Sequence, residues 1–183
     1  MYGGTITQNS KFKAQNNSSK LKIIFIGRLE KDTGISIYLK ALDILKEKNI
    51  AFTFEAYGDG TVKNSVASYG KVHGFVATLS PELEKTDIVF ASSYLSILEA
   101  FAKKKIVFSV FDNPLKKDYL TMTPFYQWIH TTDSPETLAE HIFALLKNKK
   151  EYHNSIEDAF AWVEKQTWEN VVNIYYRLWK LNL

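Results

Sequence analysis

With 183 residues, the chain has the length of one domain or of one domain with extensions, and its 45% hydrophobic content excludes a wholly disordered protein. It contains no cysteine, which excludes disulfides and thiolate metal sites, and no apolar run approaches the roughly 20 residues needed to cross a bilayer. The net charge of +3 is too small to indicate a nucleic-acid partner, although a basic patch could still contact an anionic membrane surface.

Residues 1–20 are rich in Gly, Ser, Asn, Gln and Lys and show no periodic apolar pattern, which predicts a flexible tail or interdomain linker. The predicted globular domain covers residues 21–183. It opens with the isoleucine-rich run LKIIFIG at 21–27, a pattern typical of a buried strand. The stretch 34–49 then places its apolar residues at helical spacing and predicts an amphipathic helix.

Further along the chain, short apolar runs keep alternating with helical patterns. Together they predict strands at 21–27, 51–58, 71–76, 87–91, 105–111 and 127–132. Helices are predicted at 34–49, 79–86, 92–105, 134–148, 151–165 and 168–180, with Ser80 as the N-cap of the second and Pro81 at its first position. The alternation predicts an α/β fold: a Rossmann-like, doubly wound parallel sheet of about six strands, with helices on both faces and further helices at the C-terminus.

Glycine or polar residues lie near or directly after the carboxyl end of every predicted strand. Ligands of open parallel sheets bind in the crevice at the carboxyl ends of the strands, so these residues mark one candidate site, although loops are also polar without any ligand. The residues are Gly27-Arg28, Gly58-Asp59-Gly60, His73-Gly74, Ser92-Ser93, Asp112-Asn113 and Thr131-Thr132.

Arg28 is the first candidate for a phosphate contact, because it is one of only two arginines beside 21 lysines and follows a glycine. Its planar guanidinium could bind a phosphate bidentately, while the alternative is a solvated residue in an ordinary turn. Gly58 and Gly60 form a Gly-x-Gly pattern, but Lys63 stands where a dinucleotide fingerprint needs its third glycine. A tight turn therefore explains these two glycines as well as a ligand does.

Other site chemistries find little support in the sequence. His73 is a lone histidine, a residue more often structural than catalytic, and no second ligand stands near it at metal-binding spacing. The chain has no P-loop, no Gly-x-Ser-x-Gly elbow and no Asp-x-Asp pair. We therefore expect neither a metal site nor a bound cofactor.

The segment SSYLSILEAFAKKK, at 92–105, combines cap residues with one acidic side chain. Ser92, Ser93 and Ser96 are N-cap types, so the following helix should direct free amides into the crevice, where they suit a phosphate. Glu99 has two explanations that the spacing does not separate. It could contact a ligand, or it could form an ordinary ion pair with Lys103 one turn on.

In order and spacing, four segments resemble the C-terminal, nucleotide-sugar-binding half of GT-B-fold glycosyltransferases of the group 1 family. They are KIIFIGRLEKDTGI, FEAYGDG, GKVHGFV and KTDIVFASSYLSILEAFAKKKIVFS. The resemblance continues into the C-terminal helices, and YGGTITQNSKF is similar to that family's interdomain linker.

The resemblance implies a role for each matching residue. Gly27 and Arg28 would bind the donor diphosphate, as would the amides of Leu95 and Ser96, and Glu99 would accept hydrogen bonds from the ribose hydroxyls. His73, Gly74 and Phe75 would pack on the base. The predicted donor site also includes Lys31, Gly58, Asp59, Gly60, Ser93, Tyr94 and Asn113. Arg28 and Glu99 are the predicted catalytic residues.

The sequence also departs from the family pattern at two positions. Ala91 stands eight residues before Glu99, where the family has a sugar-contacting glutamate, and the turn between them is shortened to Ser93-Tyr94. Thr33 stands where the family commonly has a phosphate-binding lysine, a role that Lys31 would have to take over. The acceptor-binding N-terminal domain of the family has no counterpart in the matched segments.

The resemblance therefore implies the donor-binding half of a hexosyltransferase-type glycosyltransferase, which moves a sugar from a nucleoside-diphosphate sugar to an acceptor hydroxyl. Its expected partners are that donor and an acceptor domain in the same or another chain. The alternatives are a non-catalytic nucleotide-sugar-binding or assembly module, or a generic doubly wound binding protein. The expected location is the cytoplasm, including the inner membrane surface.

Overall fold

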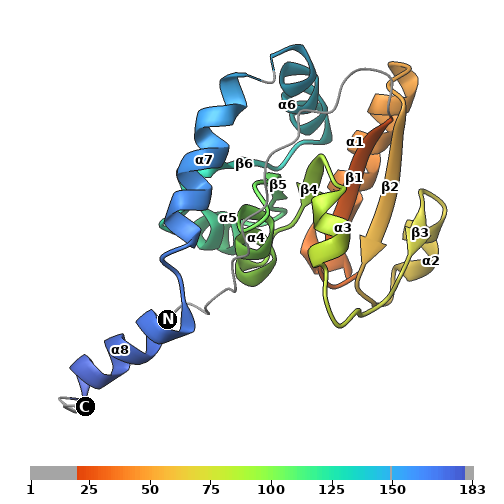
Figure 1. The fold of residues 1–183 in the computed structure, drawn as a ribbon. Helices are drawn as coiled ribbons and strands as arrows, with labels where there is room; N and C mark the ends of the chain where they lie inside the picture. Colours follow the sequence, from red (N-terminus) through yellow and green to blue (C-terminus); the bar gives the residue numbers. More distant parts are fainter. Residues whose placement is uncertain (1–19, 149, 180–183) are drawn as a thin grey trace.

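The structure is a computed structural model that describes residues 20–148 and 150–179. Six parallel strands form one sheet in the order β3-β2-β1-β4-β5-β6 (Figure 1). The strands are β1 (Leu21–Ile26), β2 (Phe52–Tyr57), β3 (Lys71–Val72), β4 (Ile88–Phe90), β5 (Ile106–Val110) and β6 (Ile129–Thr132). The predicted α/β, Rossmann-like sheet is confirmed. The predicted tail or linker at 1–20 lies outside the described residues, apart from Lys20.

Helices connect the strands and continue after the last one (Figure 1). The α-helices are α1 (Ile35–Glu47), α2 (Lys63–Ala67), α3 (Ser80–Glu84), α4 (Tyr94–Phe101), α5 (Pro114–Thr121), α6 (Pro135–Lys147), α7 (Glu151–Val163) and α8 (Trp168–Leu178). Two single turns of 3-10 helix are η1 (Lys31–Thr33) and η2 (Tyr126–Trp128).

Both faces of the sheet are covered, which explains the nearly continuous apolar runs of β1, β4 and β5. Successive side chains of a strand point to opposite faces. In β1, Ile23 and Phe25 pack with α1, α2 and α6 in one core layer. Ile24 and Ile26 pack with α3, α4, α5 and α7 in the other. Every inward position of β1 is therefore apolar, as expected of a central parallel strand.

Several predicted elements differ from the structure. The third strand, predicted at 71–76, ends at Val72, because Gly74 has a left-handed φ of 71° that an extended strand does not adopt. Helix α3 begins at Ser80 with Leu79 as its N-cap, so Ser80 is not the cap and Pro81 is the second helical residue, not the first. The short helices α2 and α5 were not predicted.

The order of the strands creates a crevice at the centre of the sheet. The chain builds β2 and β3 on one side of β1 and then places β4, β5 and β6 on its other side. Helix α1, which follows β1, packs on one face, and helix α4, which follows β4, packs on the opposite face. The loops after β1 and β4 therefore separate and leave space between them, which is where ligands of doubly wound sheets bind.

Helix α8 differs from the other long helices. It projects away from the sheet and its packed helices (Figure 1), and none of its residues is buried. The exposed fraction is 59% for Trp168 and 65% for Trp179, which follows the helix directly. Val172, Ile174 and Leu178 are exposed as well. A run of exposed large apolar side chains on one helix is typical of an interaction surface.

Candidate functional site

A cavity of about 810 Å³ occupies the central crevice, at the carboxyl ends of the strands. Its walls are the loops after β1 to β5, together with the first turns of α4 and α5. Eight residues of the predicted donor site line it: Gly27, Arg28, Gly58, Gly74, Phe75, Ser93, Ser96 and Asn113. Ser92, noted in the sequence as an N-cap type, lines it as well. The structure thus brings together residues from five separate segments of the chain.

The other predicted site residues lie outside the cavity lining. They are Lys31, Asp59, Gly60, His73, Tyr94, Leu95 and Glu99. Several are neighbours of lining residues: Tyr94 and Leu95 stand between Ser93 and Ser96, and His73 precedes Gly74. Their roles toward a donor stay predictions, as do those of the residues in the lining.

Close backbone packing explains why a glycine, Gly58, follows β2. A Cβ atom on Gly58 would lie 1.8 Å from the carbonyl oxygen of Gly27, a distance at which no side chain fits. The Gly27 amide donates a hydrogen bond to the Tyr57 carbonyl at 3.1 Å, and this bond extends the β1–β2 ladder into the loop. The floor of the cavity is therefore bare backbone at this point, open to a close approach by a ligand.

Arg28 enters the cavity as one half of an ion pair. Its Nη2 atom donates to Asp32 Oδ2 at 2.9 Å, and both side chains are 64% exposed. Asp32 was not predicted as a site residue. An exposed pair of this kind contributes only about 0–1 kcal/mol, because water solvates both partners. Arg28 is therefore available to a bound anion at little cost.

Lys116, which the sequence analysis did not single out, places a second cation in the same cavity. Its Nζ atom lies 3.4 Å from the carbonyl oxygen of Asp32. Burial lowers the pKa of Lys116, and the nearby Arg28 guanidinium lowers it further, against the opposing effect of Asp112 and Asp32. The sequence pattern that indicates helix α5, and with it the position of Lys116, is Asn113-Pro114, an N-cap residue followed by proline at the first helical position.

The N-terminus of α4 faces this cavity through Ser93 and Ser96, but its cap is atypical. The Ser93 and Ser96 hydroxyls bond each other at 2.7 Å, so the N-cap side chain binds no backbone amide. The Tyr94 amide instead donates to the Tyr119 hydroxyl at 2.9 Å. Within residues 20–148 and 150–179, the amides of Leu95 and Ser96 have no acceptor. Such amides at a helix N-terminus suit an anion.

The ion pair considered for Glu99 is not formed. The Lys103 ammonium, which is 9% exposed as a residue, bonds Glu84 Oε1 of α3 at 3.1 Å instead. Glu99 has no ion-pair partner in the described part of the chain. Its side chain remains accessible to solvent, yet the protein around the carboxylate removes enough water to raise its pKa. The explanation as an ordinary helix pair is therefore wrong.

His73 forms a supporting cluster behind the cavity wall. Its ring stacks on that of Tyr57, a lining residue, with centroids 4.5 Å apart and planes at 5°. His73 Nε2 lies 2.6 Å from Glu55 Oε2, which also accepts a hydrogen bond from the Tyr57 hydroxyl at 2.9 Å. Desolvation alone would raise the pKa of Glu55, but the hydrogen bonds from Tyr57 and His73 outweigh it and lower that pKa. The cluster fixes the Tyr57 ring in the wall.

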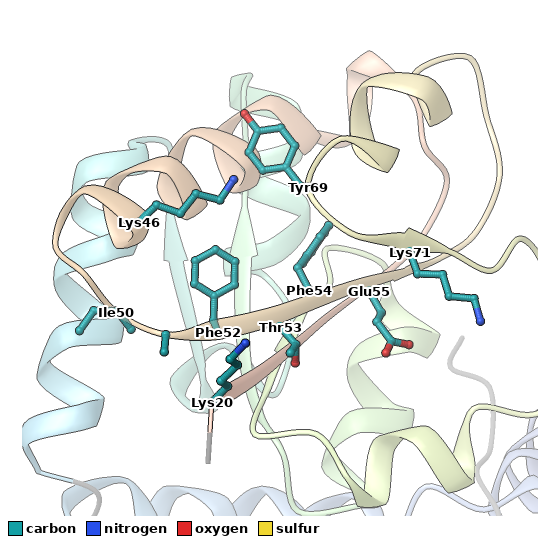
Figure 2. A pocket seen from close by; sticks show the side chains of 10 residues that line it. Lys20, Lys46, Ile50, Phe52, Thr53, Phe54, Glu55, Tyr69 and Lys71 are labelled. Carbon is teal, nitrogen blue, oxygen red and sulfur yellow. The ribbon is translucent and has the colours of Figure 1, made fainter. Parts of the chain in front are cut away.

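A second cavity, of about 540 Å³, lies along the edge of the sheet beside the first half of β2 (Figure 2). Strand β3 pairs only with Glu55 and Ala56, so the start of β2 has no neighbour on that side. Lys46 lies over the ring of Tyr69, with its Nζ atom 4.4 Å from the ring centroid. This cavity has no glycine and no helix N-terminus in its lining and lies away from the carboxyl ends of the strands, so the central cavity is the candidate site.

The described residues offer neither a metal-binding cluster nor a membrane-spanning helix. In that part of the chain, no group of three or more His, Asp or Glu side chains could hold a metal ion. No helix there is long and apolar enough to span a membrane.

Comparison of the coordinates with solved structures finds glycosyltransferases at low sequence identity. A Staphylococcus aureus TarM variant in complex with fondaparinux, alpha-GlcNAc-glycerol and UDP matches 91% of this chain with a TM-score of 0.67 and 20% identity. A glycosyltransferase from Rickettsia africae also matches 91%, with a TM-score of 0.68 and 16% identity. The chain spans only 38% and 50% of those two proteins.

A match to a single domain covers most of both chains. The C-terminal domain of LpcC, a group 1 family glycosyl transferase from Francisella tularensis, matches 80% of this chain and 85% of its own length, with a TM-score of 0.61 and 18% identity. No curated protein matches the chain by sequence. Residues 6–162 match the family model described as "Glycosyl transferases group 1". The chain therefore belongs to the glycosyl transferases group 1 family.

Proposed function

We propose that this chain is the donor-binding half of a glycosyltransferase and that its central cavity binds a nucleoside-diphosphate sugar. The observation that supports this most is the position of Arg28 beside Gly27 and the α4 N-terminus, at the carboxyl ends of the central strands. A guanidinium and free helix amides suit a diphosphate. The TarM variant, which is similar in fold, was solved with UDP.

In the proposed reaction, the bond between the anomeric carbon and the diphosphate oxygen breaks, and a bond forms from that carbon to an acceptor hydroxyl oxygen. Negative charge develops on the departing diphosphate, which takes up the proton that the acceptor hydroxyl loses. Arg28 and the amides of Leu95 and Ser96 stabilise that charge, because they are fixed in place before it appears. The proposal assigns the neutralisation to these groups and not to a metal ion.

The remaining contacts in the proposal fix the donor nucleoside. Phe75 has 81% of its surface exposed at the cavity mouth, so it offers an apolar face to a base, next to the turn at Gly74. Glu99 accepts hydrogen bonds from the ribose hydroxyls in this proposal. Because its pKa is raised by desolvation, ribose hydroxyls would replace hydrogen bonds that water does not fully supply.

We further propose that an acceptor domain, in the same or another chain, completes the active site. The chain spans well under two thirds of TarM, so a whole enzyme of that kind has a further region. The exposed apolar residues of α8, among them Trp168 and Leu178, supply a surface on which such a domain could dock. Acceptor choice would then depend on residues outside this chain.

The second candidate function is a non-catalytic nucleotide-sugar-binding or assembly module. It is favoured by the shortage of carboxylates in the cavity. Position 91 is a buried alanine, and among the described lining residues the only carboxylate is Asp32, which is paired with Arg28. Such a module would bind the donor without transferring its sugar.

Calorimetric titration with UDP-glucose, GDP-mannose and ADP-glucose tests the proposal. At least one donor should bind, and Arg28→Ala should lower its affinity by roughly ten- to a hundredfold, as expected for the loss of a charged hydrogen bond. Arg177→Ala, on α8, is the matched control and should bind as the unaltered chain does. Binding of no donor would refute both candidate functions. Donor hydrolysis by the isolated chain, abolished by Arg28→Ala, would exclude the non-catalytic module.

A further inference from the structure

We propose that Lys116 is a second diphosphate-binding cation, delivered to the cavity by α5 beside the loop that carries Arg28. This inference rests on the proposed function, because it names a further residue of the same site. Lys116 belongs to a helix that the resemblance did not assign to the donor, and its ammonium is the only lysine nitrogen among the described lining residues.

The sequence fixes the position of Lys116 at the start of α5. The Asn113 side chain accepts a hydrogen bond from the Lys116 amide at 2.9 Å, and Pro114 holds the first helical position. The long side chain then reaches the loop after β1. There its Nζ atom lies 3.6 Å from the point that a Cβ atom on Gly34 would occupy. That distance is an ordinary van der Waals contact; the side chain of Val110, 2.7 Å from the same point, is what excludes a larger residue at position 34.

The charges around the cavity make Lys116 the more available cation. The guanidinium of Arg28 is already paired with Asp32 at 2.9 Å. Lys116 forms no ion pair with any described carboxylate, and its one hydrogen bond, to the Asp32 carbonyl, is long at 3.4 Å. The Asp112 and Asp32 carboxylates act on Lys116 through space but form no ion pair with it, so its ammonium is open to a bound anion.

Partial burial also favours an anion beside Lys116. Lys116 is only partly exposed, and desolvation lowers its pKa, which means that the folded protein solvates the ammonium less well than water does. A diphosphate oxygen would restore the lost stabilisation. The Arg28 guanidinium lowers the same pKa, so the two cations repel each other, and an anion between them would relieve that repulsion.

The neighbouring Lys117 supplies a matched control. It stands next in the sequence on the same helix but does not line the cavity. Its Nζ atom lies 5.7 Å from the centroid of the Phe111 ring, and its side chain is exposed. Replacing Lys117 removes the same charge from the chain and the same side chain from α5 without changing the cavity.

The test compares Lys116→Ala, Lys116→Arg and Lys117→Ala in titrations with UDP, GDP, ADP and inorganic pyrophosphate. For the diphosphates that bind, Lys116→Ala should lower the affinity by about tenfold or more and make it less dependent on salt. Lys116→Arg should retain most of the affinity. The corresponding nucleoside, which has no phosphate, should bind the unaltered chain and Lys116→Ala equally, which separates an anion contact from a structural effect.

Two negative outcomes have different meanings. If Arg28→Ala weakens the diphosphates while Lys116→Ala and Lys117→Ala both leave them unchanged, this inference is wrong and the proposed function stands. If the unaltered chain binds none of the diphosphates or donor sugars, the proposed function fails and this inference fails with it. Far-ultraviolet circular dichroism confirms that each variant is folded before its titration is interpreted, and Lys116→Gln replaces Lys116→Ala if the alanine variant is not.

Discussion

His130 is predicted to make the fold sensitive to acid. It lies in β6, where its ring packs against Phe108 at 5.0 Å, Tyr152 of α7 at 5.1 Å and His141 of α6 at 5.9 Å, measured between centroids. Burial is the main cause that lowers the pKa of His130 from 6.5 to about 4, and the charge of His141 contributes to the same effect. The folded protein therefore holds His130 in its neutral form.

The sign and size of the effect follow from this difference. Below pH 6.5 the unfolded chain binds a proton at His130 that the folded chain does not, so protonation favours unfolding. The contribution of neutral His130 to the free energy of unfolding is fully present above pH 6.5 and is lost as the pH falls toward about 4. At about 1.4 kcal/mol per pH unit, the gap between 6.5 and about 4 corresponds to about 3 kcal/mol. That is a large share of the stability of a typical domain.

The assay is urea-induced unfolding, followed by tryptophan fluorescence, at several values between pH 7.5 and pH 4. The free energy of unfolding should fall more steeply for the unaltered chain than for His130→Gln, with a difference of about 2–3 kcal/mol over that range. Carboxylates titrate in both proteins and cancel in the comparison, as does any constant cost of lost packing. His153→Gln, at an exposed histidine of α7, is the control and should follow the unaltered chain. Parallel curves for His130→Gln and the unaltered chain would refute the reasoning.

Three other predictions concern local structure. Asn113→Ala removes the side-chain cap of α5 and should lower the free energy of unfolding by about 1 kcal/mol in urea titrations, whereas Asn113→Asp should retain it. Gly58→Ala would force a Cβ atom against a carbonyl oxygen of the neighbouring strand end and should cost about 3 kcal/mol. The Cβ atom of Gly74→Ala meets no atom within 4 Å, so this variant should lose only about 1 kcal/mol of unfolding free energy, because of its φ of 71°. A larger loss for Gly74→Ala than for Gly58→Ala would contradict the packing described for the two glycines. Replacing Trp168 and Leu178 together with serine should leave the free energy of unfolding within about 0.5 kcal/mol and reduce the binding of the dye ANS, and a larger loss of stability would show that α8 contributes to the core.

The central strands were predictable because a strand buried on both faces has an almost continuous apolar sequence. Strands β1, β4 and β5 have apolar residues at nearly every position, and the predicted ranges differ from the observed ones by one residue or less at each end. The predicted third strand was too long for a local reason. Gly74 turns the backbone into the left-handed region, and the apolar residues after it, beginning with Phe75, face solvent. An apolar pattern alone does not separate a buried strand from an exposed apolar loop.

The site was harder to predict because its electrostatics depend on contacts between distant segments. Glu99 and Lys103 have the spacing of a helical ion pair, but α4 ends at Phe101 and the lysine reaches Glu84 of α3 instead. Lys116 comes into the cavity only because α5 packs beside the loop after β1, eighty-four residues earlier in the chain. Residue type and sequence spacing identify the strand ends, whereas tertiary packing decides which side chains meet there.

The central place of β1 in the sheet also has a consequence for the order of folding. Ile23 pairs with Phe54 of β2, 31 residues away, and with Ile88 of β4, 65 residues away. Closing the longer loop costs about 0.6 kcal/mol more than closing the shorter one, since its length is roughly doubled. The β1-α1-β2 unit is therefore the favoured first structure, and the other edge of β1 stays unpaired until β4 arrives. During synthesis on the ribosome, that open edge is exposed while the segment from α2 to β4 emerges, and in that interval the chain is most prone to pair with another copy of itself.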